Sequence, residues 1–119
     1  MALVLRGTTK FGTETGYFRG SPTGAKPTGT VEGDLIVIWM SGDINSRPSV
    51  SWPSGFTAIY DQNDTDLGGG SWIYGAYKVA GASEPSTYTV SISGTFYRGG
   101  SKCSIISYYN DVGVGSWSL

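Results

Sequence analysis

Residues 27–40 read PTGTVEGDLIVIWM, in which a polar turn leads directly into six apolar residues. An apolar run of this length without a charge is typical of a β-strand that is buried on both faces. In a short chain such burial requires two packed sheets, or one sheet covered by a neighbouring subunit. We therefore expect Trp39 to lie in the core. Gly33 lies between two acidic residues, where a turn favours a positive φ, so we expect it to be the structural turn that sets the register of the strand.

Length and composition indicate one all-β domain that spans residues 1–119. The chain has 119 residues, of which 19 are glycine and five are proline, and only 14% are charged. A domain of this size buries roughly two thirds of the surface that its unfolded chain exposes, so a hydrophobic core can form. No window keeps apolar residues at helical spacing without an interrupting Gly or Pro, and we therefore expect no long helix.

Apolar runs alternate with clusters of turn residues, which predicts an antiparallel β-sandwich, jelly-roll or immunoglobulin-like, with about seven or eight strands. Residues 41–53 are expected to form a long loop. Residues 87–93 alternate cleanly and predict that Tyr88, Val90 and Ile92 point inward. The expected strands are 2–6, 16–19, 34–40, 56–61, 71–79, 86–93, 101–109 and 112–117.

Aromatic side chains make up the candidate interface. The strand over residues 71–79 carries Trp72, Ile73, Tyr74 and Tyr77, which places aromatic and aliphatic mass on both faces, and one of those faces is expected to meet a partner. Trp52 and Trp72 flank predicted loops and suit either stacking on sugar rings or anchoring a protein interface. The alternative is that both tryptophans cap the ends of the sandwich core.

Most catalytic arrangements are excluded by the composition. The chain has no histidine, so Ser-His-Asp and Cys-His pairs and the usual zinc sites cannot form. The single cysteine, Cys103, lies in a predicted strand and is expected to be a buried structural thiol. Carboxylates for glycoside hydrolysis are present, but surface loops carry such residues by default. They are Asp61, Asp64, Asp66 and Glu84. We expect no enzyme and no cofactor.

The segment Asp61–Asp66 is the best metal candidate, because oxygen ligands at alternate positions suit a hard cation. It departs from the helix-loop-helix calcium pattern, since Asp66 replaces the sharp-turn glycine and Trp72 replaces the bidentate glutamate. A solvated polar hairpin loop explains the segment equally well. We expect that Ca²⁺ has no structural role.

Charge and terminal sequence limit the expected partners and location. The formal net charge is −1 and no basic stripe is visible, which argues against nucleic-acid binding. No segment approaches the length of a membrane span. The apolar run at the start of the chain covers only residues 1–5, and no cleavage motif accompanies it. We therefore expect a first strand and not a signal peptide. A lone cysteine is consistent with folding in a reducing compartment.

Five short motifs, taken in order, resemble a small β-sandwich module of tailed-bacteriophage virion proteins. They are PTGTVEGDL at 27–35, WPSGFT at 52–57, YKVA at 77–80, SEPSTY at 83–88 and SYYNDV at 107–112. The resemblance implies no catalytic residue. Copies in longer chains continue beyond the last motif, whereas this chain stops at Leu119, so we expect the final strand to be completed by a neighbouring subunit.

Two classes of function follow from this resemblance. The first is a structural virion protein, either a capsid decoration (cement) protein or a small tail component, made in the host cytoplasm. It would bind the major capsid protein or tail subunits and occur as a homo-oligomer or as lattice-bound copies. The second is a receptor- or glycan-binding module of a tail fibre, in which Trp52, Trp72 and the Asp61–Asp66 segment would contact the host surface. Length favours the first class, because 119 residues leave no room for a separate attachment domain.

Overall fold

The computed structural model describes residues 3–6, 10–11, 21–43, 49–64, 71–93 and 101–110. Within these ranges every regular element is a β-strand, and no helix is present. All strand pairs in these ranges are antiparallel. The prediction of an all-β antiparallel fold is confirmed.

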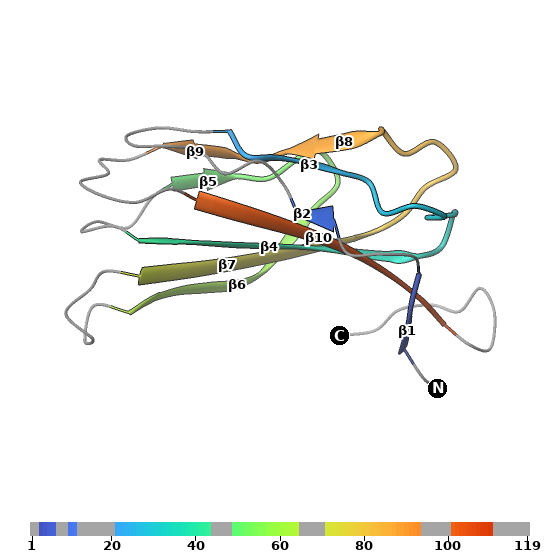
Figure 1. The fold of residues 1–119 in the computed structure, drawn as a ribbon, viewed down its shortest axis with the longest axis horizontal. Helices are drawn as coiled ribbons and strands as arrows, with labels where there is room; N and C mark the ends of the chain where they lie inside the picture. Colours follow the sequence, from blue (N-terminus) through green and yellow to red (C-terminus); the bar gives the residue numbers. More distant parts are fainter. Residues whose placement is uncertain are drawn as a thin grey trace.

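One large sheet forms the first layer of the fold (Figure 1). Its strands follow the order β1-β10-β4-β7-β6, and β2 also pairs with β10. The central ladder joins β4 to β7 over nine residue pairs, from Leu35↔Val79 to Asp43↔Ser71. The strands are β1 (Leu3–Leu5), β2 (Lys10–Phe11), β4 (Leu35–Asp43), β6 (Thr57–Asp64), β7 (Ser71–Val79) and β10 (Ser101–Asn110).

Two small sheets lie across one face of the large sheet and form the second layer (Figure 1). One pairs β3 (Thr23–Ala25) with β8 (Thr87–Thr89), and the other pairs β5 (Ser49–Ser51) with β9 (Ser91–Ser93). Only Val90 separates β8 from β9 along the chain. Its backbone N–H donates to the carbonyl of Pro22 at 3.0 Å, instead of pairing with a strand.

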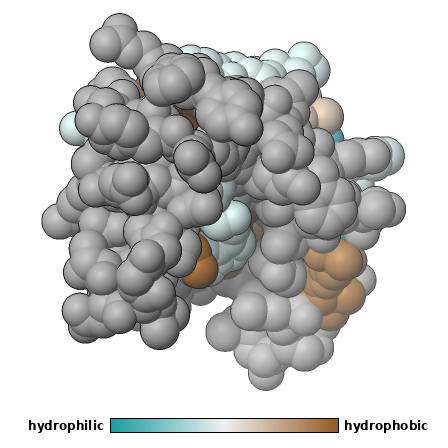
Figure 2. All heavy atoms as spheres, turned by 60° about the vertical axis from the view of Figure 1, so that its left-hand side comes forward, coloured by the Kyte–Doolittle hydropathy of each residue, from teal (hydrophilic) through white to brown (hydrophobic). Residues whose placement is uncertain are grey.

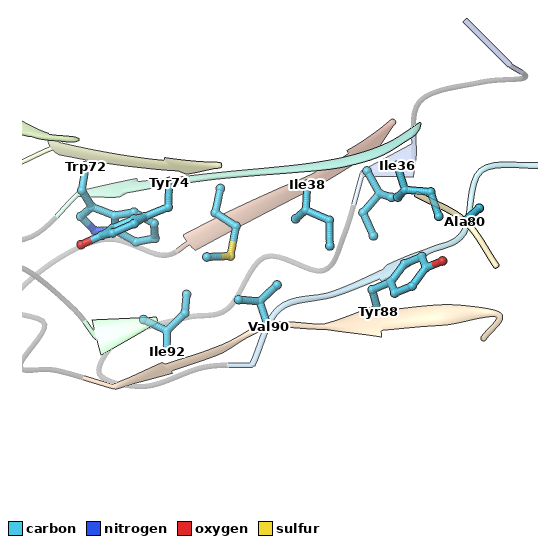
Figure 3. Close-up of a cluster of buried hydrophobic side chains, with 10 residues drawn as sticks. Ile36, Ile38, Trp72, Tyr74, Ala80, Tyr88, Val90 and Ile92 are labelled. Atoms are coloured by element: carbon cyan, nitrogen blue, oxygen red, sulfur yellow. The ribbon is translucent and has the colours of Figure 1, made fainter. Parts of the chain in front are cut away.

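The hydrophobic core lies between the two layers (Figure 3). From the second layer, Tyr88, Val90 and Ile92 point toward the large sheet, as the alternation of residues 87–93 predicts. The large sheet supplies the opposing side chains, since every second residue of a strand faces the same side. They are Ile36, Ile38, Met40, Trp72, Tyr74 and Ile105.

The observed strands differ from the predicted ones mainly at their ends. The prediction for residues 71–79 matches β7, whereas β4 and β6 extend three residues beyond their predicted ends, to Asp43 and Asp64. Residues 86–93 form two strands and not one, and the predicted loop 41–53 contains β5. Strands β2 and β3 were not predicted. The predicted strands 16–19 and 112–117 lie outside the described residues.

Trp39 corrects one expectation from the sequence. The strand is buried on both faces only over its first four residues, Leu35 to Ile38, while Trp39 is 36% exposed. Ile38 and Met40 point into the core, so the residue between them points to the opposite face of the sheet. There the indole ring covers Gly75 of the neighbouring strand, where an added Cβ would lie only 2.5 Å from Cζ3 of Trp39.

The turn before β4 has the predicted conformation at Gly33, whose φ is 88°. The turn is closed by a hydrogen bond from Asp34 N to the carbonyl of Val31, at 3.2 Å. It is also tied to the end of β7, because Gly33 N donates to the Ala80 carbonyl and Ala80 N donates to the Asp34 carbonyl. Gly33 therefore fixes where β4 enters the large sheet.

Replacing Gly33 with valine is expected to lower the free energy of unfolding by at least ~1 kcal/mol, since a β-branched residue is strongly disfavoured at positive φ. Chemical denaturation measures this change. Gly81→Val is a matched control, because its added Cβ would meet only ordinary contact, 3.6 Å from Oε1 of Glu84. Equal midpoints for Gly33→Val and wild type would contradict the assigned role of this turn.

Candidate functional site

A cluster of polar side chains gathers around Glu84, in the turn between β7 and β8. Its Oε1 lies 2.9 Å from Nζ of Lys78 and accepts a hydrogen bond from Gly81 N at 2.7 Å. Its Oε2 accepts a hydrogen bond from the Tyr88 hydroxyl at 2.8 Å. The Glu84 side chain is almost completely buried. Both carboxylate oxygens are thus occupied by donors of this chain.

Phe56 and Gly55 extend the cluster to the start of β6. Nζ of Lys78 lies 5.8 Å from the centre of the Phe56 ring, and that ring meets Tyr88 edge-on at a centroid distance of 5.3 Å. Gly55 has a φ of 84°, and an added Cβ would lie 3.4 Å from Nζ of Lys78. The cluster therefore joins the large sheet to the second layer.

The pKa shifts in this cluster favour a structural role over acid–base chemistry. Burial alone would raise the pKa of Glu84, but hydrogen bonds from Gly81, Lys78 and Tyr88 outweigh it and hold the pKa below its ordinary value of 4.5. Burial and the neighbouring Glu84 carboxylate raise the pKa of Tyr88 far above its usual range. At neutral pH Glu84 is an ionised acceptor and Tyr88 a protonated donor, so neither titrates near pH 7.

The lowered pKa of Glu84 gives a pH dependence to folding. A carboxylate with a lower pKa in the folded state stabilises the fold at pH values above its unfolded pKa. That contribution falls as the pH drops below about 4.5, the ordinary value of this group. We expect stability to decline through this acidic range, and Glu84→Gln to reduce the slope. Melting temperatures between pH 3 and pH 7 test this, with the exposed Glu32→Gln as control. An unchanged slope in Glu84→Gln would contradict it.

A second polar contact holds the N-terminal strand to the turn before β4. Nε of Arg6 lies 2.7 Å from Oδ2 of Asp34, and the same oxygen accepts a hydrogen bond from Val31 N at 2.9 Å. The two side chains are 30% and 3% exposed, respectively. Because Asp34 is buried, this ion pair belongs to the framework of the fold.

The large sheet presents a different kind of surface on the side away from the second layer. We call this side the outer face and define it by the residues of β4 and β7 that alternate with the core residues. Among the residues whose side chains the structure describes, they are Leu35, Val37, Trp39, Ser41, Ile73, Gly75, Tyr77 and Val79. Leu35 and Val37 are already buried within the chain. Ile73 is 47% exposed and Val79 is 45% exposed. Exposed hydrophobic atoms form a group near one edge of the molecule in the view of Figure 2. Apolar surface of this kind marks interaction sites in soluble proteins.

The four residues that the sequence proposed as an interface lie in different environments in the structure. Trp72 and Tyr74 are 1% and 5% exposed and lie in the core, so they do not form interaction surface. Trp72 lies over Gly42, where an added Cβ would come within 2.4 Å of Cζ2 of the indole. Trp52 is half-buried against the core cluster. Only Tyr77, also half-buried, belongs to the outer face.

Sequence reasoning placed apolar side chains, Ile73 among them, on both faces of β7, but it did not name the exposed Ile73 and Val79 as interface residues. Side chains of β7 point alternately to the two sides of the sheet. Tyr74 and Ala76 are buried on the core side, and the opposite side carries side chains of mixed size. These are Ile73, Gly75, Tyr77 and Val79. The side that faces the second layer could not be chosen from this strand alone. The buried Trp72 and Tyr74, whose rings lie 5.3 Å apart, mark the inner side.

The metal candidate and the cysteine contribute little to a described site. Strand β6 extends to Asp64, so Asp61–Asp64 form strand and not loop, and Asp66 lies outside the described residues. No group of three His, Cys, Asp or Glu residues suited to a metal ion occurs among the described residues. Cys103 pairs with Met40 in the β10–β4 ladder, and its side chain lies outside those described.

Searches against protein-family models, curated proteins and solved structures give no match to this chain. In the part of the chain that the structure describes, no helix is long and apolar enough to cross a membrane. The fold and the outer face are therefore the observations from which a function is argued.

Proposed function

We propose that this chain is a structural protein that acts through protein–protein contacts and transforms no substrate. One observation carries the proposal: the outer face of the large sheet exposes large aliphatic side chains, with Ile73 and Val79 each nearly half exposed. A solvated sheet face normally alternates hydrophobic-in with polar-out. Here the outward positions of β7 are apolar as well, which favours a face that is covered in an assembly.

The polar clusters support this assignment because they stabilise the fold itself. Glu84 is engaged by Lys78, Gly81 and Tyr88, and Asp34 is engaged by Arg6 and Val31. Groups held in this way are not available to bind or protonate a substrate. Among the described residues, the outer face is the surface best suited to a partner.

We further propose that the assembly is a phage virion, in which the chain is a capsid decoration protein or a small tail component. This part rests on the resemblance of residues 27–112 to β-sandwich modules of tailed-phage virion proteins. The partners would be the major capsid protein or tail subunits. The receptor- or glycan-binding alternative is less well supported, because Trp72 lies in the core and cannot form a stacking pair with Trp52 at the surface.

A charge on the outer face provides the test. Val79→Lys is expected to reduce incorporation into particles at least tenfold, because a partner that covers this face would bury an unpaired ammonium group. Val31→Lys is the matched control, since Val31 is 51% exposed and lies in the turn before β4. Incorporation is measured by mass spectrometry of purified particles from cells that express each variant.

Particles without the protein are expected to lose their genome at a lower temperature than complete particles, while adsorption to host cells is unchanged. Unimpaired particles that fail to adsorb would overturn the structural role and favour receptor binding. Absence of the wild-type chain from purified particles would overturn the virion assignment. Equal incorporation of Val79→Lys and Val31→Lys would show that the outer face is not the contact surface.

A further inference from the structure

We propose that residues 112–119 of the same chain fold back across the outer face and cover it over Leu35 and Val37. These residues lie outside the described ranges. The inference goes beyond the proposed function and does not depend on it, because it concerns a contact within one chain. It also limits the part of the outer face that a partner can reach.

Leu35 and Val37 point to the outer face and are nevertheless buried. Side chains alternate along a strand, and Ile36 and Ile38, which alternate with them, belong to the core cluster. Leu35 is 7% exposed and Val37 is 8% exposed, yet neither belongs to that cluster. This burial occurs within a single chain, so it requires no partner.

Neighbouring strands of the large sheet do not bury side chains on this face by themselves. Trp39 lies two residues beyond Val37 on the same strand, between the same two neighbouring strands, and is 36% exposed. On β7, Ile73 and Val79 are 47% and 45% exposed. The fall in exposure from Trp39 to Leu35 therefore indicates that a further part of the chain lies over the start of β4.

The second layer does not supply this cover, because it lies on the opposite face of the large sheet (Figure 1). The described connections join the large sheet to that layer: residues 26–34 follow β3, residues 52–56 follow β5 and residues 80–86 lead into β8. Leu5 of β1 is separated from β4 by β10 and is itself 46% exposed. The cover therefore comes from residues outside the described ranges.

Most segments outside the described ranges adjoin other parts of the fold. Residues 12–20 lead from β2 to the second layer. Residues 1–2 and 7–9 are too short to cross β10 and reach β4, given about 5 Å between strands and about 3.3 Å per residue. Three other segments adjoin the opposite end of the large sheet, where Asp43 pairs with Ser71. They are 44–48, 65–70 and 94–100.

Residues 111–119 have the position, length and composition that the cover requires. They follow β10, and Ile106 of that strand pairs with Val37. About 13 Å of strand separate Ile106 from the end of β10, whereas nine extended residues span about 30 Å. Beyond Asp111 the segment has no charged residue. Its large apolar side chains are those of Val112, Val114, Trp117 and Leu119.

This contact divides the outer face into two parts. Residues 112–119 occupy the part next to β10, and the part that includes Ile73 and Val79 remains exposed for a partner. The same segment then forms one border of the partner surface. A partner that binds the exposed part would lie beside residues 112–119 and would not need to displace them.

Photo-cross-linking of the wild-type chain tests the contact. Expression with photo-leucine places a diazirine at Leu35 with little change in the size of the side chain. Illumination of the monomer is expected to join Leu35 to residues within 112–119, as assigned by tandem mass spectrometry. The same illumination in denaturant is the control, and this cross-link should then disappear.

Thiol labelling provides a second measurement, with Val37→Cys and Ile73→Cys made separately in a Cys103→Ala background. The thiol at position 37 is expected to react with a soluble reagent at least about tenfold more slowly than the thiol at position 73, because access limits the reaction. Trp117→Lys is expected to remove most of this difference. Ile36→Cys points into the core and is the control for unfolding, since its thiol should remain protected in Trp117→Lys.

Three results would overturn the proposal. Cross-links from Leu35 to a segment other than 112–119 would assign the cover to that segment. Cross-links to 112–119 that occur only in a covalent dimer would assign the cover to a second copy. An unchanged labelling rate at position 37 in Trp117→Lys would show that this segment does not cover Val37. Reduced particle incorporation of Val79→Lys alongside any of these results would leave the proposed function intact.

Discussion

Replacing Trp72 with alanine is expected to lower the free energy of unfolding by about 3–5 kcal/mol, the range typical for truncation of a large buried aromatic side chain. The indole is 1% exposed and belongs to the core cluster. It also covers Gly42, so its removal would open a cavity in the core between the two layers. Chemical denaturation with matched m-values gives the change directly.

Two further variants test whether the loss of stability comes from the burial of the Trp72 side chain. The Nε1 atom of Trp72 is buried and has no hydrogen-bond partner among the described residues, so Trp72→Phe removes an unsatisfied donor and should cost clearly less than alanine. Trp39→Ala should also cost much less than Trp72→Ala, since Trp39 is 36% exposed. If Trp39→Ala were the more damaging of the two alanine variants, the assignment of the inner and outer faces would be wrong.

Replacing Arg6 with methionine is expected to cost about 3 kcal/mol, because it leaves the buried carboxylate of Asp34 without its cation. This value is at the low end for a broken buried ion pair. Water reaches the Arg6 side chain, which is 30% exposed against 3% for Asp34, and weakens the pair. Methionine retains most of the apolar stem, so the lost charge dominates the change.

The double variant Arg6→Met with Asp34→Asn provides the control. Removing both charges eliminates the buried unpaired carboxylate, so the double variant should be more stable than Arg6→Met alone. Thermal and chemical unfolding of the four proteins complete the cycle. A near-wild-type midpoint for Arg6→Met would mean that this ion pair contributes little to the attachment of the N-terminal strand.

Local sequence rules were sufficient for the features that depend on the backbone alone. Turn residues bounded β7 correctly, the alternation in residues 87–93 identified its inward side chains, and Gly33 adopts the positive φ that its turn requires. The short strands β3 and β5 were missed because three residues carry too little periodicity to distinguish a strand from a loop. Their pairing partners lie far along the chain, in β8 and β9.

The choice between the two faces of the large sheet could not be made from the sequence. Both sides of β4 are apolar, so the pattern gave no reason to place Trp39 outside and Trp72 inside. The second layer decides this, because its side chains fill the space above Ile38, Met40 and Trp72. The Glu84 cluster was also unpredictable, since Phe56 reaches it from a distant part of the chain.

The break at Val90 gives the two layers different mechanical characters. Long ladders run without interruption through β10, β4 and β7, whereas the second layer consists of two pairs of three-residue strands joined by one residue. A short pair can separate without disrupting the other, so local opening requires less free energy there than in the large sheet. The large sheet is thus the rigid layer of the domain, and the second layer can change its conformation locally at Val90. A partner that binds the large sheet would leave the second layer free to make such changes.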